Sequence, residues 1–233
     1  MTVVRSLAFV ALFYVWSATL AILFLPLMLA PLPVILRAFK LWSLGVMALL
    51  RACCGVRVEL RGKAHVPTGP AVIAAKHQCM FDVFAQFAWL DAHCFVMKRE
   101  LLWIPVFGWY ARRTGMITLD RKGRSDALRK LMRAAKTRID QGRQVVIFPE
   151  GTRGQPGRAG QYQVGVAALY RELDLPVIPV ATNSGLHWPA HGFIRKPGKV
   201  VFEFLEPIPP GLKRAEFMAE LERRIETASR ALL

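Results

Sequence analysis

The chain has 233 residues, enough for one sizeable α/β domain with an appendage but too few for two full domains. Hydrophobic residues make up 54% of the sequence, and the formal net charge is +16. This combination suits an anionic membrane surface or phosphorylated small molecules. It disfavours nucleic acid as a partner, since an apolar start fits no such role and the sequence has neither a zinc-finger spacing nor a polybasic run.

The N-terminal segment carries no charged side chain from Ser6 to Leu36. As one helix it would be about 47 Å long, well beyond the ~30 Å hydrocarbon core of a bilayer. Three prolines interrupt it, namely Pro26, Pro31 and Pro33. The pattern predicts a membrane hairpin with arms near Arg5–Leu25 and Val34–Cys53, either spanning or monotopic. A cleaved signal peptide is disfavoured because the apolar stretch is too long.

After Gly55 the pattern changes to short β-branched runs that alternate with amphipathic stretches. The predicted strands are Val56–Leu60, Ala71–Ala75, Cys94–Lys98, Gln144–Phe148, Val177–Ala181 and Val200–Leu205. The predicted helices are Phe81–Leu90, Ser125–Gln141, Val164–Glu172 and Lys213–Leu232. We therefore expect an α/β fold, a mostly parallel sheet flanked by helices, over residues 55–233, behind an N-terminal membrane hairpin over residues 1–54.

The four cysteines show no disulfide framework and no C-x-x-C pair. They are Cys53, Cys54, Cys79 and Cys94. We expect reduced thiols in a cytosol-like compartment. A zinc site built from His77, Cys79, His93 and Cys94 is disfavoured because the pairs lack zinc-ligand spacings, so no metal is predicted.

The first candidate catalytic pair, His77 and Asp82, directly follows the predicted strand Ala71–Ala75. Histidine is the usual general base near neutral pH, and a carboxylate that accepts its other ring proton orients it. Residues five apart lie about 140° apart on a helix, so they meet only if His77 precedes the helix and Asp82 folds back from its first turn. Alone, this H-x4-D spacing is a weak signal.

The segment Lys98–Arg121 places basic residues at both ends of a strongly apolar middle. Such a segment suits an amphiphile with a phosphate head and an acyl tail. The competing interpretation is a helix with one buried face and a solvated basic end.

A second polar cluster, Phe148-Pro-Glu-Gly-Thr-Arg153, begins at the end of another predicted strand. It brings a carboxylate, a hydroxyl and a guanidinium into one glycine-containing loop, and an arginine fork matches phosphate oxygens. The alternative is a structural turn with a surface ion pair. The loops Pro149–Gly160 and Thr182–Gly198 are both candidate walls of a site, because function concentrates in loops that follow strands.

Taken in order, these blocks resemble the glycerolipid acyltransferase family, and within it the bacterial members that acylate lysophosphatidate. The resemblance covers roughly Val56 to Pro207 and includes a fourth block, Val177-Ile-Pro-Val180. It implies an O-acyltransferase of phospholipid biosynthesis. The reaction is transfer of a fatty acyl group from acyl-CoA or acyl carrier protein to the sn-2 hydroxyl of 1-acyl-glycerol 3-phosphate.

The resemblance also implies roles for individual residues. His77 becomes the general base and Asp82 its partner, while the positions matching the acceptor-binding motifs are Lys98, Arg121, Glu150, Gly151, Thr152 and Arg153. The thioester is a co-substrate, and no other cofactor is implied. The implied partners are membrane lipid, a lysophospholipid acceptor and the acyl donor. The implied location is a bacterial inner membrane, with the catalytic domain on the cytoplasmic face.

The sequence departs from the family pattern at Lys76 and Cys79, which flank the histidine where small or amide residues are more usual. The segment Gln161–Gly165 also lacks the lysine that many members carry there. These departures leave the acceptor open between lysophosphatidate, glycerol 3-phosphate and a lyso-aminolipid such as lyso-ornithine lipid.

Two rival functions come from other classes. A covalent hydrolase would use Cys79 or Ser184 as nucleophile, but neither lies in a nucleophile-elbow signature. A basic lipid-binding protein without activity would explain the charge and the hydropathy, but not the ordered motif blocks.

Overall fold

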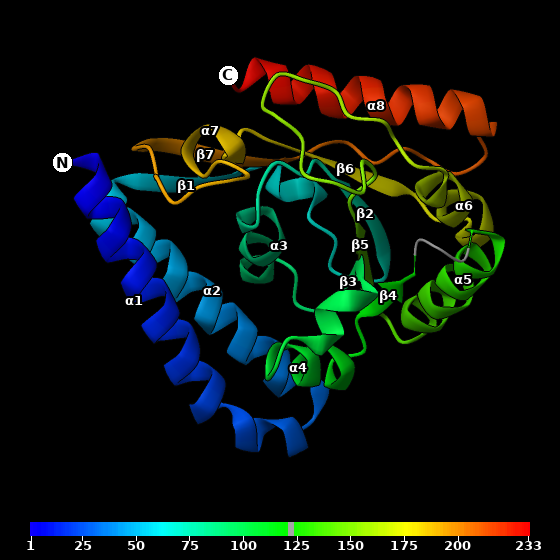
Figure 1. The fold of residues 1–233 in the computed structure, drawn as a ribbon. Coiled ribbons are helices and arrows are strands. Elements are labelled where there is room, and N and C mark those ends of the chain that lie inside the picture. Colours follow the sequence, from blue (N-terminus) through cyan, green and yellow to red (C-terminus); the bar gives the residue numbers. More distant parts are fainter. Residues whose placement is uncertain (121–123) are drawn as a thin grey trace.

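A computed structural model of the chain describes residues 1–120 and 124–233. A seven-stranded sheet lies at its centre, with helices on both faces (Figure 1). The strands are β1 (Val56–Arg61), β2 (Ala71–Ala75), β3 (His93–Lys98), β4 (Ile117–Leu119), β5 (Gln144–Ile147), β6 (Val177–Thr182) and β7 (Gly198–Phe204). The α-helices are α1 (Thr2–Leu23), α2 (Leu32–Cys54), α3 (Phe81–Ala85), α4 (Phe107–Arg113), α5 (Arg124–Asp140), α6 (Val164–Leu173), α7 (Ser184–His187) and α8 (Arg214–Ala231). The described residues also form four 3₁₀ segments: η1 (Leu25–Leu29), η2 (Lys63–His65), η3 (Gln86–Ala88) and η4 (Arg99–Trp103).

The strand order is β1-β7-β6-β2-β5-β3-β4. Every neighbouring pair is parallel except β6 and β7, which are antiparallel. The prediction of a mostly parallel α/β sheet is therefore confirmed. β2 lies at the middle of the order and all five of its residues are buried, as expected for a strand covered on both faces.

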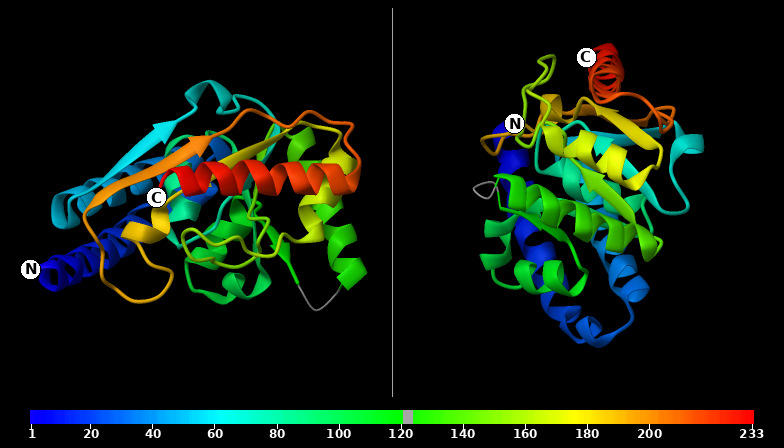
Figure 2. Two further views of the ribbon diagram at one scale, coloured as in Figure 1. Left: turned by 90° about the horizontal axis from the view of Figure 1, so that it is seen from above. Right: turned by 90° about the vertical axis from the view of Figure 1, so that its right-hand side faces the viewer.

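The side chains of β2 alternate between two hydrophobic cores. Ala71, Ile73 and Ala75 face the core that includes residues of α1, α2 and α3, while Val72 and Ala74 face the core that includes residues of α5, α6 and α8. Two further views show α8 lying across one face of the sheet and the N-terminal helix pair on the other (Figure 2). The alternation follows from the two-residue repeat of a strand.

The N-terminal segment forms the predicted helical hairpin, and its prolines explain where the helices end. α1 stops at Leu23, ahead of Pro26 in η1. α2 begins at Leu32 with Pro33 in its first turn, where the missing N–H is not needed. α2 ends at Gly55, which adopts a left-handed φ of 69°. By length and composition, both helices could cross a membrane.

Several boundaries differ from the sequence prediction. The predicted helix Phe81–Leu90 is the short α3 followed by a tighter turn, η3. The predicted amphipathic segment Lys98–Arg121 contains three elements, η4, α4 and the short edge strand β4. A three-residue strand is too short to show a two-residue repeat, which is why the pattern missed β4.

Candidate active site

Three loops converge at one edge of the sheet because they leave adjacent parallel strands. β2 pairs with β5 through Ala74 and Ile147, and with β6 through Ala75 and Val180. The chain that follows β2 carries His77, the chain that follows β5 carries the Pro149–Gly160 loop, and α7 follows β6. Ligands of open parallel sheets bind beyond the carboxyl ends of the strands, so this edge is the candidate site.

His77 and Asp82 meet in the geometry that their spacing requires. His77 precedes α3 and Asp82 lies in the first turn of that helix. The distance from His77 Nδ1 to Asp82 Oδ2 is 3.2 Å. A carboxylate in this position favours the tautomer with the proton on Nδ1, which leaves Nε2 free to accept a proton.

Asp82 is completely buried and its carboxylate is held from several sides. Oδ2 accepts hydrogen bonds from the backbone N–H of Gln78 (2.5 Å) and of Cys79 (2.7 Å). Oδ1 accepts a hydrogen bond from the hydroxyl of Ser184, the first residue of α7. These donors satisfy the charged form of the carboxylate and fix its direction toward the imidazole.

Cys79 and Ser184 are fully buried, which argues against the covalent-hydrolase alternative. Burial, with the charge of Asp82 as the next cause, raises the pKa of the Cys79 thiol. A thiol that stays protonated because its pKa is raised, and that a substrate cannot reach, is a poor nucleophile. Both side chains instead contact Asp82 Oδ1, and the Cys79 thiol lies 3.4 Å from the Ser184 hydroxyl.

The imidazole of His77 keeps partial access, with 16% of its side chain exposed. Its ring stacks on Phe148 at a centroid distance of 4.2 Å and an interplanar angle of 25°. Phe148 begins the F-P-E-G-T-R motif, so this contact joins the two predicted clusters directly.

The carboxylate of Glu150 is buried and already bonded within the protein. Oε1 accepts from Lys76 Nζ (2.7 Å) and from the N–H of Gly160 (3.1 Å). Oε2 accepts from the N–H of His77 (3.1 Å). In this arrangement Glu150 holds the loop and the histidine, whereas contact with an acceptor stays a prediction.

The residues of the F-P-E-G-T-R motif that follow Glu150 are more exposed than Glu150. Gly151 has a φ of 64°, a conformation that favours glycine and turns the loop outward. Thr152 and Arg153 are exposed, and Arg153 donates one bond to the carbonyl of Ala190 at 3.0 Å. Their side chains are the part of the loop that can meet a phosphate group.

The remaining predicted acceptor contacts are less defined. Lys98 is the exposed last residue of β3, which pairs with β5, so it lies at the same sheet edge. Arg121 lies outside the described residues. Its role, like those of Lys98, Thr152 and Arg153, stays a prediction.

Sequence reasoning missed Tyr162 and Glu226, considered Ser184 only as the nucleophile of a rival hydrolase, and noticed Lys76 only as a departure from the family pattern. Ser184 is 102 residues from Asp82, and Glu226 is 150 residues from Lys76. Only the position of Ser184 in a loop already marked as a candidate wall gave any signal. The three-dimensional fold was needed to identify these partners.

Comparison with known proteins identifies the family of the chain. The family model described as Acyltransferase matches residues 57–183. A 1-acyl-sn-glycerol-3-phosphate acyltransferase of Pseudomonas aeruginosa is 36% identical over 159 residues, which are 68% of this chain and 62% of that protein. One of Helicobacter pylori with the same name is 30% identical over 175 residues, which are 74% of this chain and 73% of that protein.

The chain spans less than two thirds of the Pseudomonas relative, and 46% of the sheep relative named 1-acyl-sn-glycerol-3-phosphate acyltransferase alpha. The crystal structure of the 1-acyl-sn-glycerophosphate (LPA) acyltransferase PlsC from Thermotoga maritima is similar with a TM-score of 0.81. At 21% identity, covering 100% of this chain and 99% of that one, it establishes the fold. By its matched residues and its relatives, the chain belongs to the acyltransferase family.

Proposed function

We propose that the protein transfers a fatty acyl group from acyl-CoA or acyl carrier protein to the sn-2 hydroxyl of 1-acyl-glycerol 3-phosphate. The observation that carries this proposal is the His77–Asp82 pair stacked on the F-P-E-G-T-R loop, in a chain of the acyltransferase family. The names of the bacterial relatives support lysophosphatidate as the acceptor.

In the proposed mechanism, Nε2 of His77 takes the proton from the sn-2 hydroxyl as its oxygen attacks the thioester carbonyl carbon. The tetrahedral intermediate collapses with cleavage of the carbon–sulfur bond, and the imidazolium returns its proton to the leaving thiolate. No residue becomes acylated. Proton transfer by a positioned base contributes about 10²–10⁴-fold to the rate, and alignment of the two substrates must supply much of the remainder.

Arg153 is our proposed phosphate ligand, with Lys98, Thr152 and Arg121 as further acceptor contacts. Arg153 is exposed on the loop that holds His77 and makes one bond to a backbone carbonyl. Its remaining N–H groups could hold a phosphate bidentately.

The N-terminal hairpin is proposed to keep the site at the surface of a membrane. α1 exposes large apolar side chains, and a second exposed apolar cluster at η4 and α4 consists of Trp103, Ile104, Phe107 and Trp109. Arg113 of α4 joins this cluster to the hairpin turn through the carbonyls of Met28 and Ala30, each at 2.6 Å. Exposed tryptophans beside arginines suit a bilayer with anionic headgroups. We propose a bacterial inner membrane, with the catalytic domain on its cytoplasmic face.

An assay of the purified full chain in lipid vesicles tests this function. The acceptors are lysophosphatidate, glycerol 3-phosphate and lyso-ornithine lipid, each offered with acyl-CoA and with acyl carrier protein. We expect phosphatidate and free thiol in equal amounts from lysophosphatidate. Without an acceptor, no labelled acyl group should remain on the protein. Acyl label on the protein would exclude the mechanism, and transfer only to another acceptor would exclude the substrate.

A further inference from the structure

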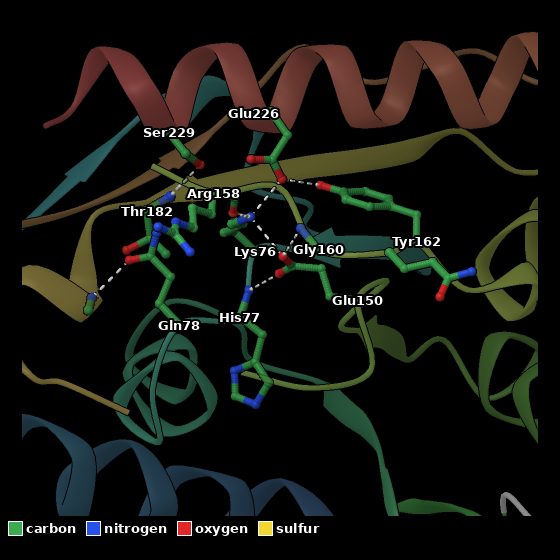
Figure 3. Close-up of polar contacts among 12 residues, drawn as sticks. Lys76, His77, Gln78, Glu150, Arg158, Gly160, Tyr162, Thr182, Glu226 and Ser229 are labelled. Atoms are coloured by element: carbon green, nitrogen blue, oxygen red, sulfur yellow. Dashed lines mark hydrogen bonds and ion pairs between the residues drawn. The ribbon is translucent and has the colours of Figure 1, made fainter. Parts of the chain in front are cut away.

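The proposed mechanism does not use Lys76, although it directly precedes the candidate base and is 1% exposed. Its Nζ donates to Glu150 Oε1 (2.7 Å), to Glu226 Oε1 of α8 (2.6 Å) and to the carbonyl of Arg158 (3.0 Å). Figure 3 shows the amine between the two carboxylates beneath α8, with the His77 ring pointing away from them. All three donor positions of the ammonium group are therefore used.

The second carboxylate of this cluster is held from outside the loop. Glu226 Oε1 also accepts from the hydroxyl of Tyr162 at 3.0 Å. Burial, with the charge of Glu226 next, raises the pKa of Tyr162, which keeps the phenol a neutral donor. The cluster therefore attaches α8 to the base of the loop that begins at Pro149.

The other side of the cluster is the backbone of the catalytic histidine. Glu150 accepts from the N–H of His77 at 3.1 Å, and the N–H of Gly154 donates to the carbonyl of His77 at 2.8 Å. His77 is thus held on both sides by the loop that carries Arg153. The position of that loop depends on the Glu150 carboxylate, which Lys76 holds.

Removing the lysine charge would leave two buried carboxylates facing each other without their shared cation. Breaking a buried ion pair by deleting one partner is costly because the remaining charge is uncompensated. Glu150 would then turn or rearrange, and with it the backbone of His77. Displacement of a catalytic group by about 1 Å can cost on the order of 10²-fold in rate.

We propose that Lys76 is a positioning residue for acyl transfer. Through Glu150, it fixes the backbone of His77 and the loop of Arg153 in one arrangement, and its separate bond to Glu226 attaches the cluster to α8. This inference rests on the proposed function. It gives the position before the histidine a task that an uncharged residue there could not perform in the same way.

The first test is Lys76→Met in the full chain, assayed in vesicles with lysophosphatidate and acyl-CoA. We expect kcat/KM for the acceptor to fall about 10- to 100-fold, through a higher acceptor KM and a lower kcat, while the donor KM is unchanged. Glu226→Gln keeps the Lys76–Glu150 pair, so it should lower the melting temperature and leave the acceptor KM near that of wild type. Lys199→Met removes an exposed lysine that pairs with Glu59 and serves as the matched control.

A second variant moves Glu150 without removing any charge, in case Lys76→Met does not fold. A Cβ at Gly160 would lie 2.7 Å from Glu150 Oε1 and 3.2 Å from its Cδ and Cγ. Gly160→Ala should therefore displace the carboxylate and reproduce the rise in acceptor KM. Gly69→Ala is the matched control, because among the described residues no atom beyond its chain neighbours lies within 4 Å of an added Cβ.

The outcomes separate the two proposals. If wild-type protein transfers no acyl group to lysophosphatidate, the proposed function is wrong. If wild type is active and folded Lys76→Met retains both kcat and acceptor KM, the cluster only stabilises the fold and the positioning role is excluded. If Lys76→Met does not fold, unchanged kinetics of Gly160→Ala exclude the role in the same way. Loss of acceptor affinity in Lys76→Met, or in Gly160→Ala where Lys76→Met does not fold, supports the inference.

Discussion

Two opposite edges of the same parallel sheet each carry a histidine and an arginine, but in different environments. At the carboxyl edge, His77 follows β2 and Arg153 lies on the loop after β5. At the amino edge, His93 begins β3 and Arg143 directly precedes β5. His93 and Ala71 both pair with Gln144, which places the starts of β2, β3 and β5 side by side.

At the amino edge, the polar groups are used to hold the fold together. Arg143 donates to the carbonyls of Thr114 (2.6 Å), Ala92 (3.3 Å) and His93, and it is 3% exposed. His93 is fully buried and its ring stacks on Phe87 at 4.4 Å. At the carboxyl edge, the His77 side chain is partly exposed and the Arg153 side chain is exposed. Both edges use a histidine and an arginine. The candidate site differs from the structural cluster because its side chains stay exposed enough to meet a ligand.

The largest effect should follow from His77→Ala, because it removes the proposed base from the carboxyl edge. We expect the initial rate of acyl transfer to fall about 10³-fold. The melting temperature should stay close to that of wild type, since the ring is partly exposed. His65→Ala, in η2, is the control. Turnover retained by His77→Ala would exclude this residue as the general base.

Asp82→Asn keeps the shape of the orienting residue and removes its charge. The amide can no longer accept from the imidazole, Ser184 and two backbone N–H groups together, so we expect kcat to fall about 10²-fold. The measurement is the pH–rate profile with the acceptor saturating. A profile and kcat identical to wild type would show that Asp82 does not orient the base.

Arg143→Met tests the amino edge and should affect folding instead of catalysis. It leaves buried carbonyls without their donor, so we expect a loss of about 2–3 kcal/mol in the free energy of unfolding. Chemical denaturation measures this loss, with Arg129→Met on the exposed face of α5 as the control. A rise in acceptor KM at a temperature where the variant is folded would contradict the division between the two edges.

Arg153→Ala should show the complementary behaviour at the carboxyl edge. We expect the KM for lysophosphatidate to rise about tenfold, equivalent to roughly 1.4 kcal/mol, because a charge-assisted phosphate contact is lost. The donor KM and the melting temperature should not change. Arg171→Ala, an exposed arginine of α6, is the control. If the acceptor KM is unchanged, Arg153 does not bind the phosphate.

The sequence allowed prediction of those parts of the site that depend on local order along the chain. The apolar run Ala71–Ala75 predicts a buried strand, and the His77–Asp82 spacing then requires a loop followed by a helix turn, which is the geometry found. The hairpin is predicted equally well, because the positions of prolines in an apolar run are local information.

The partners of Lys76 could not be predicted in this way. Glu226 reaches it from α8, 150 residues later, and Ser184 reaches Asp82 from α7, which follows β6. Such contacts depend on the strand order and on which helix covers which face of the sheet. The spacing of a few residues along the sequence specifies neither. For the same reason Glu150 was predicted to contact the acceptor, while its buried bonds to Lys76 and His77 were not foreseen.

The smallest effect concerns the pH dependence of stability at the amino edge. The pKa of His93 is lowered to about 4. Burial is the largest cause, and the charge of the nearby Arg143 acts in the same direction. Because the unfolded chain titrates near the ordinary value of 6.5, it binds more protons than the folded protein between these two pH values. Stability is therefore complete above about pH 6.5 and is lost as the pH falls toward 4. From about pH 7.5 to about pH 5.5 the expected loss in the free energy of unfolding is about 1 kcal/mol.

His93→Phe removes the titrating group and keeps an aromatic ring beside Phe87. The unfolding free energy of this variant should therefore fall less over that pH range. Equal pH dependence in urea titrations of the two proteins would show that His93 does not take up a proton on unfolding in this pH range.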